Sequence, residues 1–206
     1  MSEPRSAVFL VDDEPLVLRA VSRLLRSAGL RVETFASPAD FLARGDLAGQ
    51  GCLVLDIAMP RLTGLDLQRE LAARGSHLPI IFLTGRADVP MTVQALKGGA
   101  VDFLTKPVDD AVLLAAIGRA LESGRVAREQ RADLDAIRAR LATLTPRERE
   151  VLDQIAAGRL NKQVAADLGT VEKTIKVHRG RVMEKMQVAS IAELARLIER
   201  LAGAGG

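Results

Sequence analysis

The segment CLVLDIAMPRLTGLDL, residues 52–67, decides the fold of this chain. It opens with a short apolar run that no polar residue interrupts, which is typical of a strand buried on both faces of a sheet. The run ends at Asp56, a loop containing Pro60 follows, and a helical pattern starts at Gly64. A buried strand, a polar residue at its end and a helix form the repeating unit of a parallel α/β sheet.

Four other apolar runs flank this segment, each followed by a stretch of helical period. The predicted strands are 7–11, 31–35, 52–56, 79–84 and 101–104, and the predicted helices are 16–28, 38–44, 64–73, 88–98 and 109–121. Such alternation calls for right-handed crossovers and for helices on both faces of the sheet. Residues 6–121 are therefore predicted to form an α/β, doubly wound, five-stranded parallel-sheet domain of flavodoxin-like topology, with its functional groups at the carboxyl ends of the strands.

Residues 122–142 are polar and favour a helix, and we interpret them as a helical linker. Apolar residues recur three and four apart, at Leu134, Ile137, Leu141 and Leu144. This spacing fits a solvated connecting helix, and it also fits a short coiled-coil seam of about two heptads. Both interpretations stay open from the sequence.

Residues 143–203 read as an all-α domain of four helices, predicted at 146–157, 162–168, 171–186 and 191–202. The first begins with Thr145 as N-cap, Pro146 at the first helical position and Glu148 three residues after the cap, which is a capping box. The second of these helices is short, and a turn at Gly169 joins it to the third. This order predicts a helix-turn-helix domain.

The formal charge of +3 is divided unevenly. Residues 1–120 hold 13 Lys and Arg against 14 Asp and Glu, whereas residues 121–206 hold 16 against 12. A basic second half suits DNA, although this much charge is also common on solvated surfaces. The absence of Trp and Tyr argues against base-stacking platforms for single strands. A lone cysteine, Cys52, excludes a disulfide framework, and without a long apolar run we expect a cytoplasmic protein with no membrane partner.

Polar residues gather where the predicted strands end. Asp12 and Asp13 follow the first strand, Asp56 the third, Thr84 ends the fourth and Lys106 follows the fifth. Each alone is a weak signal, since aspartates cap helices and Lys-Pro pairs form surface turns. Together, three carboxylates at one sheet edge need a hard cation, and Mg²⁺ paired with a phosphate is the usual solution. We expect Asp56 to be a nucleophile that forms an aspartyl phosphate, with Lys106 on the phosphoryl oxygens and Thr84 hydrogen-bonding.

The motifs VDDE, LDIAMPRLTGLDL, IIFLTG and DVPMTVQALKGGAVDFLTKP resemble the receiver domain of response regulators, closest to the FixJ subfamily of the NarL/FixJ group. The resemblance implies phosphotransfer from a histidine kinase to Asp56. It implies Mg²⁺ bound by Asp13, Asp56 and the carbonyl of Ala58, with Asp12 nearby. It also implies a cis Lys106–Pro107 bond and a switch in which Thr84 moves toward the phosphoryl group while an aromatic residue turns inward. That aromatic residue is Phe103 here, where many relatives have Tyr.

The third helix of the second domain has two faces. Lys173, Lys176, Val177 and Gly180 share one face, and Ile175, Val182 and Met186 share another. A basic face with a small apolar residue suits the major groove, whereas a lone charged helix would be taken as merely solvated. The string LTPREREVLDQIAAGRLNKQVAADLGTVEKTIKVHRGRVMEKM resembles the LuxR-type DNA-binding domain. This implies that the third helix is the recognition helix and that the last helix pairs subunits; the implied DNA contacts are Lys173, Thr174, Lys176, Val177, His178, Arg179 and Arg181. His178 is equally explained as a packing residue.

The sequence thus predicts a two-component response regulator. Phosphorylation of Asp56 would control dimerisation, through the face around residues 91–101, and sequence-specific binding of double-stranded DNA. The expected partners are a histidine kinase, DNA, a second copy of the chain and RNA polymerase, and no catalytic residues are expected. One alternative is a phosphorylation-independent transcription factor with a degenerate receiver. Another is a Mg²⁺-dependent phosphatase, against which stands Ala58 in place of a second acidic residue.

Overall fold

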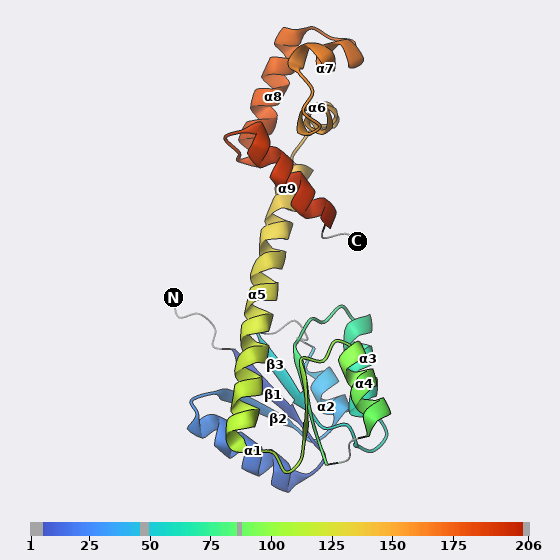
Figure 1. Ribbon diagram of the computed structural model, residues 1–206, viewed down its shortest axis with the longest axis vertical. Coiled ribbons are helices and arrows are strands. Elements are labelled where there is room, and N and C mark those ends of the chain that lie inside the picture. Colours follow the sequence, from blue (N-terminus) through green and yellow to red (C-terminus); the bar gives the residue numbers. More distant parts are fainter. Residues whose placement is uncertain (1–5, 46–49, 86–87, 204–206) are drawn as a thin grey trace. The chain divides into compact units, whose positions relative to one another are not determined.

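The computed structural model describes residues 6–45, 50–85 and 88–203. The chain divides into two compact units, with the division falling between Ala127 and Arg128 in the sequence; Figure 1 draws both units. Each unit has its own hydrophobic core, so each is described by itself. The predicted boundaries at 121 and 143 stay predictions. In the described part of the chain, no helix is long and apolar enough to cross a bilayer.

The first unit contains the predicted parallel sheet. Its strands are β1 (Ala7–Val11), β2 (Arg31–Phe35), β3 (Gly51–Leu55), β4 (Ile80–Thr84) and β5 (Asp102–Thr105). Its helices are α1 (Pro15–Ser27), α2 (Pro38–Ala43), α3 (Gly64–Ala73), α4 (Val89–Lys97) and the first part of α5 (Asp110–Ala142). The strands are all parallel in the order β2-β1-β3-β4-β5. The expected doubly wound topology is confirmed.

Two apolar layers cover the sheet, one on each face. Alternate residues of β1 point to opposite faces, so Phe9 joins one layer and Leu10 the other. The layer around Phe9 includes residues of α2, α3 and α4, whereas the layer around Leu10 includes residues of α1 and α5. Strands β1, β3 and β4 are buried along their whole length. Their uninterrupted apolar runs follow from this two-sided burial.

The end of α4 is fixed by two glycines with different roles. Gly99 has a φ of +89°, which closes the helix in the left-handed region that glycine favours. Gly98 lies against the side chain of Gln68 from α3, and a Cβ at this position would stand 2.6 Å from the Gln68 Oε1. Gln68 is buried, and its Nε2 donates a hydrogen bond to the Ala95 carbonyl at 2.9 Å. Gly98 therefore allows α3 to hold the last turn of α4.

The described part of the second unit contains helices and no strand. After the last part of α5 come α6 (Pro146–Ala156), α7 (Asn161–Asp167), α8 (Glu172–Met186) and α9 (Ile191–Gly203). The predicted capping box is confirmed, since Thr145 Oγ1 accepts from the Glu148 N–H and Glu148 Oε2 accepts from the Thr145 N–H. The core takes Val151 and Ile155 from α6, Val164 from α7 and Val182 from α8.

The predicted linker continues α5 without a break, and three residues of the apolar stripe, Ile137, Leu141 and Leu144, belong to the second core. Ile137 is 3% exposed and belongs to the same buried cluster as the residues of α6 and α8. Leu141 and Leu144 pack against that cluster and are partly buried. The helical linker between the domains stays a prediction. The three-and-four spacing reflects packing within the unit.

Candidate functional site

Asp12 and Asp56 lie side by side because their strands are neighbours. β1 and β3 pair with Val11 opposite Leu55, so the residue after each strand reaches the same sheet edge. The Asp56 N–H donates to the Val11 carbonyl at 3.0 Å, which fixes this arrangement. Both carboxylates are buried, with exposures of 1% for Asp12 and 5% for Asp56. Two buried negative charges on neighbouring strand ends require a positive partner.

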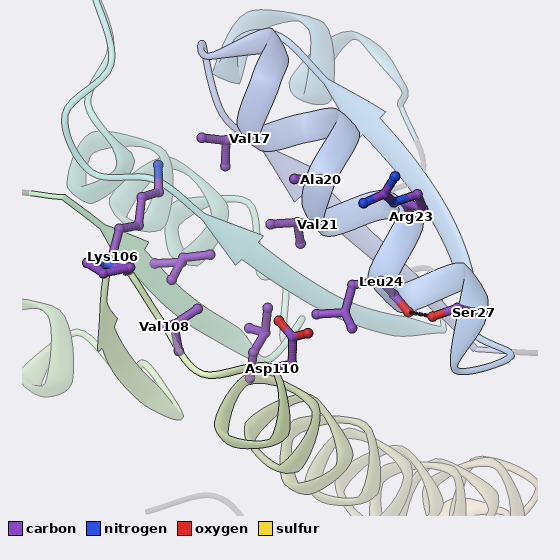
Figure 2. A pocket seen from close by; sticks show the side chains of 12 residues that line it. Val17, Ala20, Val21, Arg23, Leu24, Ser27, Lys106, Val108 and Asp110 are labelled. Atoms are coloured by element: carbon purple, nitrogen blue, oxygen red, sulfur yellow. Dashed lines mark hydrogen bonds between the residues drawn. The ribbon is translucent and has the colours of Figure 1, made fainter.

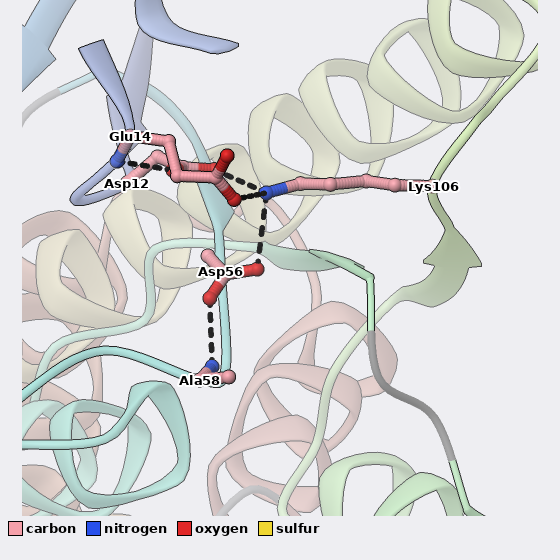
Figure 3. Close-up of polar contacts among 5 residues, drawn as sticks. All are labelled: Asp12, Glu14, Asp56, Ala58 and Lys106. Atoms are coloured by element: carbon pink, nitrogen blue, oxygen red, sulfur yellow. Dashed lines mark hydrogen bonds and ion pairs between the residues drawn. The ribbon is translucent and has the colours of Figure 1, made fainter. Parts of the chain in front are cut away.

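Lys106 supplies that positive charge. It follows β5, its N–H donates to the Thr84 carbonyl at 2.8 Å, and its peptide bond to Pro107 is cis, as the resemblance implies. Its Nζ donates to Asp12 Oδ2 at 2.6 Å and to Asp56 Oδ1 at 3.2 Å (Figure 3). One ammonium group therefore bridges the two carboxylates.

The remaining carboxylate oxygens accept from backbone amides. Asp12 Oδ1 accepts from the Glu14 N–H at 2.9 Å, and Asp56 Oδ2 accepts from the Ala58 N–H at 2.7 Å. Charge-assisted hydrogen bonds of this kind hold a carboxylate in a single orientation. Ala58 thus contacts Asp56 through its amide, whereas the resemblance assigns a role to its carbonyl.

Burial and charge act in opposite directions at this site. Burial, the larger effect, raises the pKa of Asp12 even though Lys106 and the Glu14 amide stabilise its charged form. Burial alone would lower the pKa of Lys106, but its bonds to Asp12 and the charge of Asp56 raise that pKa above its ordinary value. The two directions agree physically, because one ammonium is stabilised by two carboxylates while each carboxylate has only a share of one ammonium.

The helix after Asp56 begins very close to it. A Cβ on Gly64, the first residue of α3, would lie 2.2 Å from the Asp56 carbonyl oxygen and 3.0 Å from the Ile57 Cα. The Gly64 N–H donates to the Ile57 carbonyl at 3.0 Å. Thr63 caps α3 through a capping box with Asp66, which sets the direction of the helix. The absence of a side chain at Gly64 therefore allows the start of α3 to pack against the backbone of Asp56.

The other predicted residues surround this centre unevenly. Asp13 is exposed, and among the described residues no three Asp, Glu, His or Cys side chains stand close enough to hold a metal ion. Thr84 is fully buried at the end of β4. Phe103 is partly buried, with its ring centroid 6.2 Å from that of Phe82. The three carboxylates predicted to converge are thus arranged as a bridged pair, Asp12 and Asp56, with Asp13 outside it.

The donor set nevertheless fits a hard divalent cation. Asp12 and Asp56 pair with Lys106, and Glu14 Oε1 lies 3.9 Å from the same Nζ, so carboxylates outnumber the ammonium at the sheet edge. Carboxylate and carbonyl oxygens are the ligands that Mg²⁺ prefers. Asp13 is exposed and therefore free to turn toward the bridged pair.

A cavity of about 720 Å³ lies beside the site, between α1 and the connection from β5 to α5 (Figure 2). Its walls are mainly apolar, and the stem of Lys106 forms part of them; the lining residues are Val17, Ala20, Val21, Arg23, Leu24, Ser27, Leu83, Lys106, Pro107, Val108, Asp110 and Leu113. Lys106 therefore has two environments: its ammonium contacts the carboxylates of Asp12 and Asp56, and its aliphatic stem lines the cavity.

In the second unit, α8 has the two predicted faces. Ile175, Val182 and Met186 are fully buried, whereas Lys173, Lys176 and Arg181 are exposed and Val177 is 50% exposed. This separation arises because residues three and four apart lie on one side of a helix. A basic side is thereby left open to solvent.

Three of the predicted contact residues are half-buried. They are Thr174, His178 and Arg179. Arg179 donates from Nη1 to Asn161 Oδ1 at 3.2 Å, which ties α8 to the start of α7. His178 Nδ1 is buried and has no hydrogen-bond partner among the described residues.

A buried ion pair that sequence reasoning missed lies at the other end of α8. Lys185 Nζ donates to Glu148 Oε2 at 2.6 Å and to the Thr143 carbonyl at 3.1 Å. The Glu148 side chain is 3% exposed and that of Lys185 33%. The hydrogen bond from Lys185 and the Thr145 amide lower the pKa of Glu148 to about 2. The capping box pointed to Glu148, but nothing in the sequence paired it with Lys185.

Comparisons with known proteins agree with both units. The family model described as response regulator receiver domain matches residues 8–118. The model described as bacterial regulatory proteins, luxR family, matches residues 142–198. Nodulation protein W of Bradyrhizobium diazoefficiens is 46% identical over 197 residues, which are 96% of this chain and 87% of the relative. The transcriptional regulatory protein FixJ of Rhizobium meliloti is 42% identical over 199 residues, 97% of each chain.

Two full-length solved structures resemble the chain. The response regulator StyR, solved at low resolution, has a TM-score of 0.87 at 42% identity, covering 96% of this chain and 100% of StyR. FixJ from B. japonicum has a TM-score of 0.60 at 38% identity, covering 97% and 98%. These matches define the class, a receiver domain followed by a LuxR-type helix-turn-helix domain. The chain belongs to the NarL/FixJ family of two-component response regulators, which confirms the predicted family, fold and function as a DNA-binding regulator of transcription. Receiver domains generally use Mg²⁺ at their phosphorylation site.

Proposed function

We propose that Asp56 accepts a phosphoryl group from a histidine kinase. An Asp56 carboxylate oxygen attacks the phosphorus of a phosphohistidine, the P–O bond forms as the P–N bond breaks, and the imidazole leaves. The observation that carries this proposal is the bridging of Asp56 and Asp12 by Lys106 at the sheet edge, with Asp56 Oδ1 facing a cation. Lys106 compensates charge before transfer and pairs with phosphoryl oxygens after it.

Asp13, Asp56 and the Ala58 carbonyl would hold Mg²⁺, with Asp12 close by. When bound, the ion would neutralise charge on the transferring phosphoryl group. The excess of negative charge around Lys106 supports this assignment. The side chain of Asp13 has to turn inward, which its exposure allows.

The phosphorylated receiver would dimerise through the face of α4 and β5. Three large apolar side chains support this choice, Val89, Val93 and Leu96, with exposures of 77%, 43% and 47%. Thr84 and Phe103 would change position as Lys106 turns to the phosphoryl group. Phosphorylation can shift this equilibrium only by stabilising one form more than the other, so the unphosphorylated protein samples the dimer weakly.

A dimer would present two copies of α8 to half-sites about one helical turn apart. Lys173, Lys176, Val177 and Arg181 are the open contacts, and Thr174, His178 and Arg179 the half-buried ones. α9 would contribute to pairing of subunits. A regulator of this kind works on the chromosome, so a cytoplasmic location and contact with RNA polymerase belong to the proposal.

Two alternative functions have less support than a phosphorylation-controlled regulator. The relatives are named as regulators, which supports a protein without enzymatic turnover, against a Mg²⁺-dependent phosphatase. The complete set of Asp12, Asp13, Asp56, Thr84 and Lys106 argues against a degenerate receiver and a phosphorylation-independent factor.

Sedimentation of the full chain tests the proposal. Wild type and Asp56→Asn are compared in Mg²⁺ with and without beryllium fluoride as phosphoryl mimic, and Asp40→Asn, an exposed residue of α2, is the matched control. We expect a shift from monomer to dimer in wild type and in the control, and none in Asp56→Asn. An equal response of Asp56→Asn, or no shift in any variant, contradicts phosphorylation-driven dimerisation through Asp56.

A further inference from the structure

The C-terminal end of α8 is held by the last part of α5. α8 ends at Met186, and Gln187 follows in the left-handed region with a φ of 56°. This ending leaves backbone carbonyls pointing out of the helix, where positive charge is favourable. Arg140 of α5 donates from Nη1 to the Met186 carbonyl at 3.4 Å. The contact is long, so its effect is mainly that of a positive charge at the negative end of the helix dipole.

The same stretch of α5 enters the core beneath α8. Ile137 lies one turn before Arg140, is 3% exposed and belongs to the cluster that contains Val182 and Met186. Asp133, one turn earlier again, pairs with Arg200 of α9 at 3.3 Å. Successive turns of α5 thus contact the core, the end of α8 and α9.

The α5 residues that make these contacts precede the region matched by the luxR-family model. The luxR-family model begins at residue 142, whereas Ile137 and Arg140 precede it. The compact second unit begins at Arg128. We infer that residues 128–142 are a positioning element for α8, with Ile137 and Arg140 as its points of contact, rather than a connector between domains. This inference rests on the proposed role of α8 in reading DNA.

The expected effect on DNA binding follows from the anchoring. An anchor that favours one orientation of α8 raises the population able to bind, and apparent affinity scales with that population. Removing a charge from a helix end changes such a population by about two- to fivefold. Loss of Arg140 should therefore weaken DNA binding by about two- to fivefold.

Paired substitutions in the full chain test this. Arg140→Met is compared with Arg138→Met, which removes the same charge from the same helix at an exposed position paired only with Asp135 in the described structure. Affinity is measured by fluorescence anisotropy over a range of salt concentrations. The probe is a labelled duplex selected from a randomised pool by the wild-type chain. Circular dichroism checks that each variant is folded at the assay temperature.

Positioning predicts a specific pattern. Arg140→Met binds about two- to fivefold more weakly than Arg138→Met at every salt concentration, both variants keep the same slope of log affinity against log salt, and Arg140→Lys restores binding. Ile137→Val, which removes one methyl group from the core, weakens binding in the same slope-independent way. If Arg140→Met unfolds the second unit, the Arg140→Lys and Ile137→Val comparisons still decide the matter.

Two results overturn the inference. Equal affinities of Arg140→Met and Arg138→Met show that the anchor does not act on α8. A salt slope lower by about 0.9 in Arg140→Met alone shows that Arg140 contacts a DNA phosphate directly. Lys176→Met separates the two proposals, because Lys176 is exposed on α8 itself. If Lys176→Met binds like wild type, the DNA-reading role of α8 fails; if only Arg140→Met does, the positioning role alone fails.

Discussion

Replacing Glu148 with glutamine removes one negative charge from the second unit with almost no change of shape. Glu148 Oε2 accepts from the Thr145 N–H at 2.9 Å and from Lys185 Nζ at 2.6 Å. Glutamine also serves as the third residue of a capping box, so the bond from Thr145 is kept. The substitution therefore removes only the negative charge opposite Lys185, whose ammonium keeps the Thr143 carbonyl and a neutral amide oxygen as acceptors.

The expected loss of stability is about 1.5 kcal/mol. A hydrogen bond between charged groups contributes about 1.5–3 kcal/mol. The Glu148 side chain is almost fully buried, but that of Lys185 is one-third exposed, and water partly compensates its ammonium after the change. We therefore take the lower end of the range, which corresponds to about a tenfold change in the unfolding equilibrium.

Native-state hydrogen exchange followed by mass spectrometry measures this unit by unit. Peptides of α6 and α8 should exchange about tenfold faster in Glu148→Gln, while peptides of β1 and β3 are unchanged. Glu150→Gln is the control, because its pair with Arg147 is on the surface and contributes at most about 0.5 kcal/mol. Acceleration below about twofold, or equal acceleration in both variants, would refute the reasoning.

The same pair predicts a pH dependence. The pKa of Glu148 is about 2 in the folded protein, below its ordinary value of 4.5. A lowered folded pKa means that the stabilisation is present above pH 4.5 and is lost as the pH falls toward about 2. Urea unfolding at a series of pH values should show wild type and Glu148→Gln converging over this window. A difference that persists unchanged to pH 2 contradicts the assignment.

Three further substitutions test the receiver by urea unfolding and ligand-induced stabilisation. Gly98→Ala should cost about 1 kcal/mol, because its Cβ displaces the Gln68 amide, and a Gln68→Ala background should remove most of that cost; additive effects contradict the contact. Gly64→Ala should cost about 3 kcal/mol or more, since its Cβ meets the Asp56 backbone, and should abolish beryllium fluoride binding; a neutral effect refutes the close approach. Lys106→Met should destabilise the metal-free receiver by about 3 kcal/mol, and Mg²⁺ should raise its melting temperature more than that of wild type. A smaller response to Mg²⁺ in Lys106→Met would show that the lysine does not compete with the ion.

The predicted elements agree with the structure wherever burial imposes a period on the sequence. The β3 run is apolar at every residue because both faces of the sheet are covered, and α8 separates Ile175 from Lys176 because only one side meets the core. Topology then brought Asp12, Asp56 and Lys106 to one edge, since parallel strands end together. These inferences depend on local pattern and on the handedness of crossovers alone.

Contacts between distant side chains had no such signal. Glu148 and Lys185 are 37 residues apart and pair only because α6 and α8 cross in the core. In the sequence, Gln68 is an ordinary polar residue of a predicted helix. Its buried contact with the end of α4 is visible only in the structure, where Gly98 lies against its side chain. The spacing at Ile137 suggested a solvated helix or a coiled-coil seam, and core packing, which the structure shows, produces the same spacing.

Lys106 is held at the sheet edge through both its side chain and its backbone. In the structure its ammonium is held by Asp12 and Asp56, and its N–H by the Thr84 carbonyl at the end of β4. If Asp56 carries a phosphoryl group, the strongest negative charge moves beyond the carboxylates, and the ammonium gains by following it. The backbone N–H of Lys106 is bonded to the Thr84 carbonyl, so one residue connects the proposed phosphorylation site to the end of the neighbouring strand β4.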